Sequence, residues 1–122
     1  MKNLLLSMLF LMIVCYTQQV MAQNSDISDR VKQMTEKQTE QLSLTPEQVP
    51  HVEAVNLDFI TGMQQAKDGS GSKISKFKSF KKLDETRTKS MKAILTAEQF
   101  KTFESVKKEN RKELKTRYNK SK

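Results

Sequence analysis

A repeated pentapeptide constrains the fold of this chain more than any other feature: LTPEQ at residues 44–48 returns 51 positions later as LTAEQ at residues 95–99. In each copy the threonine hydroxyl can accept a hydrogen bond from the backbone N–H three residues on, and the glutamine side chain can bond back to the threonine N–H. This capping box marks the start of an α-helix, so the simplest interpretation of the motif is helix capping at two helices that begin alike. The motif residues are Leu44, Thr45, Gln48, Leu95, Thr96 and Gln99.

Hydrophobic spacing predicts an all-α fold of four helices. Apolar residues recur every three or four positions, and no segment alternates with the period of two that a half-buried strand needs. The predicted helices cover residues of about 25–42, 46–67, 73–94 and 97–118. The glycine and serine residues of segment 68–72 predict the turn of a helical hairpin between the second and third of them.

Two residues leave the course of the second helix open. Pro50 has no N–H one turn inside this helix, so we expect it either to kink the first turn or to shift the start of the helix to His51. Asn56 lies within the apolar stripe, where it is either a buried contact that sets the register or a half-exposed side chain. Of these two positions for Asn56, we expect the half-exposed one.

The first 22 residues have the pattern of a cleaved secretory signal. Lys2 precedes a largely apolar run over residues 4–15, which is shorter than the roughly 20 residues of a membrane-spanning helix. A small-residue cleavage site ends at Ala22. We therefore expect a single mature domain over residues 23–122 in the periplasm. Cleavage removes the one cysteine, Cys15, so this domain would have no thiol for a disulfide or for catalysis.

Positive charge is concentrated in the second half of the mature domain. Residues 23–72 carry 4 basic and 8 acidic side chains, whereas residues 73–122 carry 17 basic and 6 acidic ones. This uneven distribution of charge predicts a cationic surface on the second half of the mature domain. Such a surface attracts acidic proteins or anionic membrane surfaces. Nucleic acid is not an expected partner, because the signal predicts export.

The mature domain has few residues with the chemistry of a catalytic or metal site. His51 is the only histidine, and Glu47, Glu53 and Asp58 do not form a tight carboxylate cluster at helical spacing. The glycines of segment 68–72 are not followed by the Lys-Ser or Lys-Thr of a phosphate-binding loop. We therefore predict a protein that is not an enzyme and that uses no metal and no cofactor.

The predicted binding surface combines cations with aromatic rings in the second half of the chain. The cations would attract an acidic or unfolded client over a long range, and the rings would contact its apolar segments. The alternative is that the lysines only keep the helices soluble and the aromatic residues form the core. The candidate client-binding residues are Lys73, Lys76, Phe77, Phe80, Lys81, Arg87, Phe100, Phe103, Lys107 and Arg111.

The two LTxxQ motifs, in a small basic helical chain behind an export signal, resemble the Spy/CpxP family of periplasmic LTxxQ proteins. This resemblance implies a homodimer of extended helical hairpins with a basic, partly apolar concave face. It also implies an ATP-independent chaperone that binds unfolded or aggregation-prone envelope proteins. CpxP-like relatives instead regulate an envelope-stress sensor. That regulatory role, or binding to anionic membrane surfaces, is the alternative function.

Overall fold

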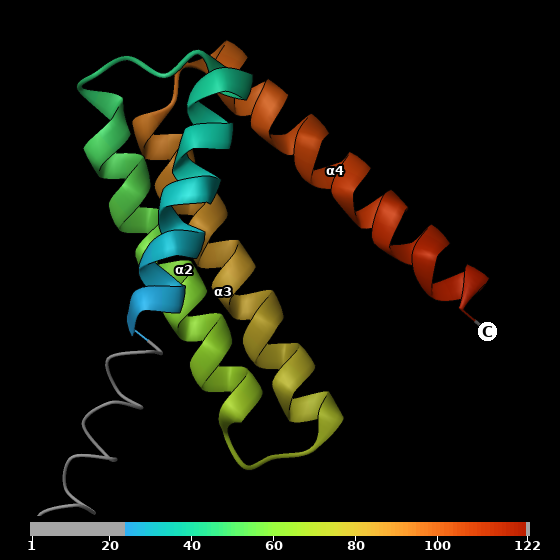
Figure 1. Ribbon diagram of the computed structural model, residues 1–122. Coiled ribbons are helices and arrows are strands. Elements are labelled where there is room, and N and C mark those ends of the chain that lie inside the picture. Colours follow the sequence, from blue (N-terminus) through green and yellow to red (C-terminus); the bar gives the residue numbers. More distant parts are fainter. Residues whose placement is uncertain (1–23, 122) are drawn as a thin grey trace, which may run out of the picture.

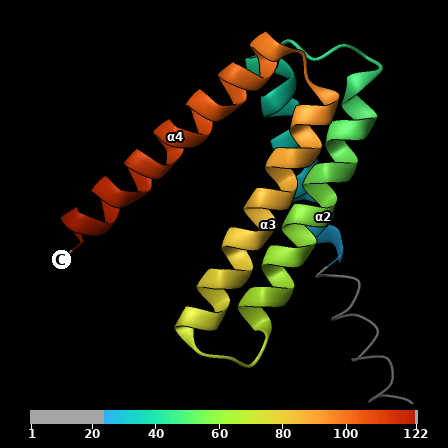
Figure 2. The ribbon, with the colours of Figure 1, turned by 180° about the vertical axis from the view of Figure 1, so that it is seen from behind.

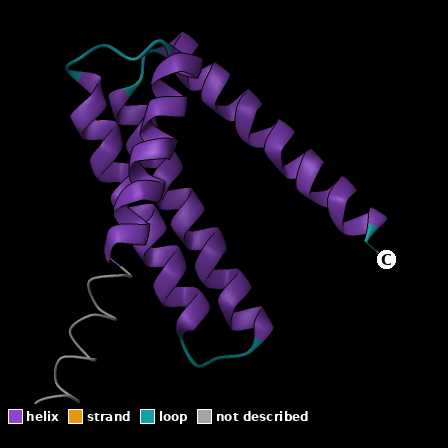
Figure 3. Ribbon diagram, viewed as in Figure 1, coloured by secondary structure: helices purple, strands orange, loops and turns teal. Residues whose placement is uncertain are grey.

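The computed structural model describes residues 24–121, and this part of the chain is all-α with four helices and no strand (Figure 3). A helix over residues 24–42, called the first helix below, is followed by α2 (Gln48–Asp68), α3 (Lys73–Ile94) and α4 (Ala97–Lys120). The predicted all-α class with four helices is confirmed, and each helix lies within two residues of its expected bounds. The predicted signal and its cleavage site lie outside the described residues. Within residues 24–121, no helix is both long enough and apolar enough to cross a bilayer.

The helices α2 and α3 run antiparallel, side by side, and are joined by the short turn at residues 69–72 (Figures 1 and 2). The first helix packs across this hairpin, whereas α4 leaves the end of α3 and diverges from it (Figure 1). Gly62 permits the close approach within the hairpin, since a Cβ atom there would lie 2.5 Å from a methyl carbon of Leu83. The result is a packed body of three helices from which α4 projects.

The apolar core gathers at the end of the molecule where both LTxxQ motifs lie. Val52 and Met91 have no solvent exposure there, and Leu44 and Leu95 of the two motifs are buried beside them. The full burial of such a side chain stabilises a fold by about 1.5–3 kcal/mol. The buried residues of this cluster are Leu42, Leu44, Val52, Met91, Leu95 and Phe103.

Asn56 is fully buried, so the half-exposed position expected from the sequence is wrong. Its side-chain nitrogen donates hydrogen bonds to the hydroxyl of Thr35 at 3.0 Å and to the side-chain oxygen of Gln38 at 2.6 Å. Both acceptors are buried residues of the first helix. A buried amide that loses such partners is costly, so these bonds hold the first helix in one register on α2.

The regular part of α2 begins at Gln48, two residues after the expected start and three before His51. The backbone N–H groups of Gln48 and Val49 already donate to the carbonyl of Thr45, as in a first helical turn. Pro50 has no N–H to donate to the carbonyl of Pro46, so the bond that would continue this turn is missing. Pro50 therefore lies inside the first turn of the regular helix, and the predicted shift of the start to His51 is wrong.

Candidate binding groove

Both LTxxQ motifs form capping boxes. The N–H of Thr45 donates to the Gln48 side-chain oxygen at 3.0 Å, and the N–H of Gln48 donates to the Thr45 hydroxyl at 3.3 Å. The corresponding distances in the second motif, between Thr96 and Gln99, are 2.9 and 3.2 Å. These bonds satisfy backbone donors that have no partner within their own helix.

The two glutamines also bind each other, a contact that was not predicted from the sequence. The side-chain nitrogen of Gln48 lies 2.8 Å from the side-chain oxygen of Gln99, and the reverse bond spans 3.0 Å. Each nitrogen also donates to the residue that precedes the other motif: Gln48 to the carbonyl of Ile94 at 3.2 Å, and Gln99 to that of Ser43 at 3.3 Å. We call residues 42–48 and 94–99 the motif junction. Its bonds run in both directions between the motifs and tie together the turns before α2 and α4.

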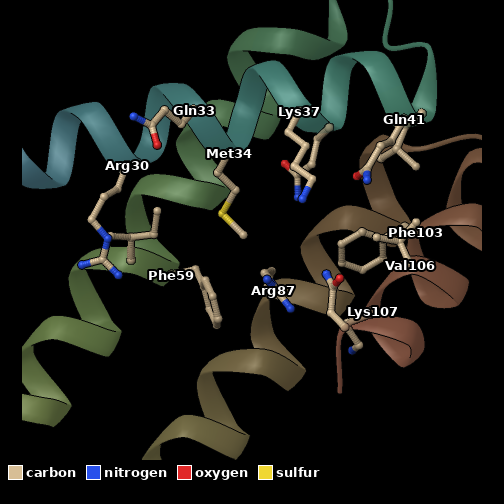
Figure 4. Close-up of a pocket in the computed structure, with 14 residues that line it drawn as sticks. Arg30, Gln33, Met34, Lys37, Gln41, Phe59, Arg87, Phe103, Val106 and Lys107 are labelled. Atoms are coloured by element: carbon tan, nitrogen blue, oxygen red, sulfur yellow. The ribbon is translucent and has the colours of Figure 1, made fainter. Parts of the chain in front are cut away.

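A groove of about 470 Å³ lies beside this junction, between the first helix and the three that follow (Figure 4). Four cations line it, Arg30, Lys37, Arg87 and Lys107, and the described residues of its wall include no acid. The wall also carries the thioether of Met34 and aromatic rings. The lining residues are Arg30, Gln33, Met34, Lys37, Gln38, Gln41, Leu42, Phe59, Ile60, Arg87, Phe103, Val106, Lys107 and Asn110.

Arg87 forms the floor of the groove together with two aromatic rings. Its side chain is only 10% exposed, and the central carbon of its guanidinium group lies 4.0 Å from the ring centre of Phe59 and 5.6 Å from that of Phe103. One terminal nitrogen donates to Asp84 at 2.6 Å, while the buried Nε has no hydrogen-bond partner among the described residues. The faces of the rings attract the cation, so the guanidinium group is held in a largely apolar environment.

Asp84 holds three cations around one carboxylate. Besides Arg87, it accepts a bond from the Lys107 ammonium group at 3.0 Å and one from Arg111 at 2.7 Å. Lys107 also donates to the hydroxyl of Thr88 at 2.8 Å. Burial alone would raise the pKa of Asp84, but the hydrogen bond from Lys107 and the charges and bonds of its cationic partners outweigh it and lower that pKa. This carboxylate therefore stays ionised and joins α3 to α4.

The predicted client-binding residues separate into three groups. Arg87, Phe103 and Lys107 line the groove, and Arg111 is outside the groove wall and binds Asp84. Phe100 is half-buried against the core, with its ring centre 6.1 Å from that of Phe103. The remaining residues lie on α3 near the turn at residues 69–72, away from the groove (Figure 1): Lys73, Lys76, Phe77, Phe80 and Lys81.

The aromatic residues divide between the core and the surface. Phe103 is buried, whereas Phe77 is 68% exposed. Phe80 and Phe100 are partly buried. The alternative interpretation, in which all the aromatic residues form the core, therefore fails for Phe77.

The wall that the first helix contributes was not predicted from the sequence. Arg30, Met34, Lys37 and Gln41 follow one another at spacings of four, three and four residues, which places them on one side of that helix. This periodicity is present in the sequence, but positive charge is denser in the second half of the chain, where the cationic surface was predicted. No local sequence pattern identifies the role of Asp84, because its partners Lys107 and Arg111 on α4 lie more than 20 positions away in the sequence.

The described residues contain no group of three histidine, cysteine, aspartate or glutamate side chains that could hold a metal ion. His51 is exposed in the first turn of α2. The side chains that line the groove offer positive charge, hydrogen-bond donors and apolar contacts.

Residues 17–103 match the model of a protein family described as Domain of unknown function (DUF4890). No curated protein and no solved structure matches the chain. The matched range includes the first helix, α2, α3 and the beginning of α4, and it ends at Phe103. The Spy/CpxP resemblance stays a prediction.

Proposed function

The chain belongs to the family described as Domain of unknown function (DUF4890), and from this premise we propose that it is an ATP-independent, chaperone-like binding protein of the periplasm. In this proposal the groove binds unfolded or aggregation-prone envelope proteins. It contacts those segments of the client that carry both acidic and apolar side chains. The protein works by binding and release and makes no covalent bond. The Spy-like hairpin arrangement and the homodimer that the sequence resemblance implies belong to the same proposal.

The composition of the groove wall is the observation that carries this proposal. Four cations without an acid in the described wall produce a positive potential, which speeds the encounter with acidic segments. Asp84 already pairs with Arg87 and Lys107, whereas Arg30 and Lys37 are exposed at the groove and bind no acid within the described chain. We therefore assign the first contact with a client carboxylate to Arg30 and Lys37.

The apolar part of the wall suits a client without a fixed structure. Met34 has a flexible, polarisable side chain that adapts to different partners, and the ring of Phe59 offers an apolar face beside it. A volume of about 470 Å³ lies within the range of small-ligand pockets, so the groove accepts a few side chains of an extended segment. Such a site selects by charge and apolar content, as a chaperone for many clients requires.

An aggregation assay without nucleotide tests this function. The model client is an acidic protein that has been reduced and alkylated, and light scattering monitors its aggregation. We expect the protein to suppress aggregation at low salt and to lose much of this effect at high salt, because salt screens the exposed cations. A client that precipitates equally fast with and without the protein at low salt would remove the proposal.

A double substitution in the groove, Arg30→Gln with Lys37→Gln, makes the test specific to this site. Both side chains are exposed, so the fold should be unaffected, and the protein concentration needed for half-protection should rise about fivefold. Lys32→Gln with Lys67→Gln is the matched control, since both are exposed lysines outside the groove wall and the same number of charges is removed. An equal loss in the control would show that only the total charge matters.

A pull-down from envelope extract separates this function from the regulatory alternative. A chaperone should retain many clients, whereas a CpxP-like regulator should retain one partner in a fixed ratio. Sedimentation velocity on the mature domain tests the homodimer independently of any client.

A further inference from the structure

A second surface, distinct from the groove, lies where α4 diverges from α3. From the motif junction the two helices stay in contact as far as Asp84 of α3, which binds Lys107 and Arg111 of α4. Farther along, α4 continues away from the body of the molecule (Figures 1 and 2). Every residue from 108 to 120 is exposed. We call residues 73–83 of α3 and 108–120 of α4 the distal arms.

The sides of the two helices that meet at Asp84 carry exposed apolar residues along the distal arms. On α3 the stripe through Asp84 continues at helical spacing to Lys81, Phe77 and Ile74. On α4 the stripe through Lys107 and Arg111 continues in the same way to Leu114 and Tyr118. Four of the five large hydrophobic residues exposed in the described chain lie on these stripes: Ile74 at 70%, Phe77 at 68%, Leu114 at 66% and Tyr118 at 61%.

The charge around these four residues has one dominant sign. Residues 73–83 include five lysines and no acid, and residues 108–120 include six basic and two acidic side chains. The same surface of a second copy would bring the same positive charge and be repelled. An acidic partner would be attracted, and its carboxylates would meet lysine and arginine side chains at both edges of the apolar stripes.

We propose that the facing stripes of α3 and α4 form a docking surface for an acidic amphipathic helix of a partner protein. A helix that lies along the opening between two diverging helices contacts the inner edge of each with one broad apolar face, as in other complexes where a helix fills a groove. Its acidic residues would then flank that stripe beside the basic side chains of the distal arms. A flat anionic membrane fits less well, because the four apolar residues lie on facing sides of two helices. This surface would bind a folded segment in addition to the unfolded clients of the groove.

Fluorescence anisotropy with a labelled model peptide tests this proposal on the mature protein. The probe is a peptide of about 18 residues, or five helical turns, with leucine at helical spacing and glutamate elsewhere. A second peptide of the same composition has its leucines dispersed around the helix. We expect only the amphipathic peptide to saturate, with an affinity that falls steeply as salt rises. Equal binding of both peptides would overturn the proposal.

The variant Phe77→Ser with Leu114→Ser should weaken binding of this peptide about tenfold or more, because two exposed apolar contacts are lost. Both residues are about two-thirds exposed, so the helical circular dichroism and the melting temperature should remain unchanged. Leu57→Ser is the matched control, since Leu57 is the fifth exposed hydrophobic residue, at 46%, and lies on α2. The control should keep its affinity within twofold, and an equal loss would overturn the proposal.

Three further outcomes distinguish a helix-docking surface from a groove site, a membrane contact and a dimer interface. If Arg30→Gln with Lys37→Gln abolishes peptide binding, the peptide occupies the groove and the docking surface is wrong. If vesicles rich in anionic lipid bind through Phe77 and Leu114 while the peptide does not, the surface is a membrane contact instead. If the protein forms a dimer that Phe77→Ser with Leu114→Ser dissociates, the occupant is a second copy.

Discussion

The motif junction and the distal arms use the same kinds of residue for opposite purposes. At the junction Leu95 is buried against the neighbouring Met91 and Phe103, and the polar side chains of Gln48 and Gln99 bind each other. On the distal arms Phe77 and Leu114 are exposed among lysines. The difference indicates that the buried apolar contacts are concentrated at one end of the described chain, and that Phe77 and Leu114 contribute little to stability.

Among the variants that test this comparison, Met91→Ala should lose the most stability. Met91 is fully buried, and the loss of its side chain leaves a cavity, so we expect the free energy of unfolding to fall by about 3 kcal/mol. Phe77→Ala should change it by less than about 0.5 kcal/mol, because Phe77 is exposed. Urea denaturation followed by circular dichroism measures both. Similar losses in the two variants would show that the distal arm is part of the core.

Gln48→Ala and Gln99→Ala come next, and together they test the coupling across the junction. Each substitution removes the bonds to the other glutamine, the capping bond from the threonine N–H and the bonds to backbone carbonyls, so each should cost about 1–3 kcal/mol. The double variant should lose less than the sum of the two by about 0.5–2 kcal/mol, since the shared bond can be lost only once. Strict additivity in the double-mutant cycle would mean that the two capping boxes act independently.

Asp84→Asn should have a smaller effect, and this effect should depend on pH. The neutral amide leaves Arg87 and Lys107 without their counter-charge, so we expect a loss of about 1–2 kcal/mol at neutral pH. The pKa of Asp84 is lowered in the folded state, so its stabilising contribution is complete above its unfolded-state pKa and is lost as pH falls through the folded-state pKa. Urea titrations from neutral to acid pH should show the free energies of unfolding of the original protein and of Asp84→Asn converging. If the difference between the two free energies of unfolding stays constant down to the lowest pH, the charge of Asp84 is not the source of its stabilising effect.

Ser43→Gly should give the smallest change, and in the stabilising direction. Ser43 ends the first helix with a φ of 52°, and the N–H of Leu44 donates to the carbonyl of Thr39 at 3.2 Å, which is the pattern of a Schellman motif. Glycine adopts this left-handed conformation without strain, so the substitution should add about 0.5–1 kcal/mol. A thermal melt is sensitive enough to detect it. A fall in melting temperature would mean that the serine side chain itself stabilises the junction.

Local features of the sequence were sufficient to predict the helices and their ends. The capping boxes at Thr45 and Thr96 and the glycine–serine turn at residues 68–72 act within a few residues, so they can be read directly from the chain. Contacts between distant segments were not predictable in this way. Burial of Asn56, the cations around Asp84 and the pairing of Gln48 with Gln99 all depend on which helices pack together, and no local pattern specifies that.

The paired glutamines also bear on the order in which the chain folds. Each capping box forms within one turn, but the bonds between Gln48 and Gln99 join positions 51 residues apart, so they require that α2 and α3 already lie side by side. These bonds would then be absent from the folding transition state and present in the native state. Loss of either glutamine should accordingly shorten the lifetime of the folded protein while leaving its rate of refolding nearly unchanged.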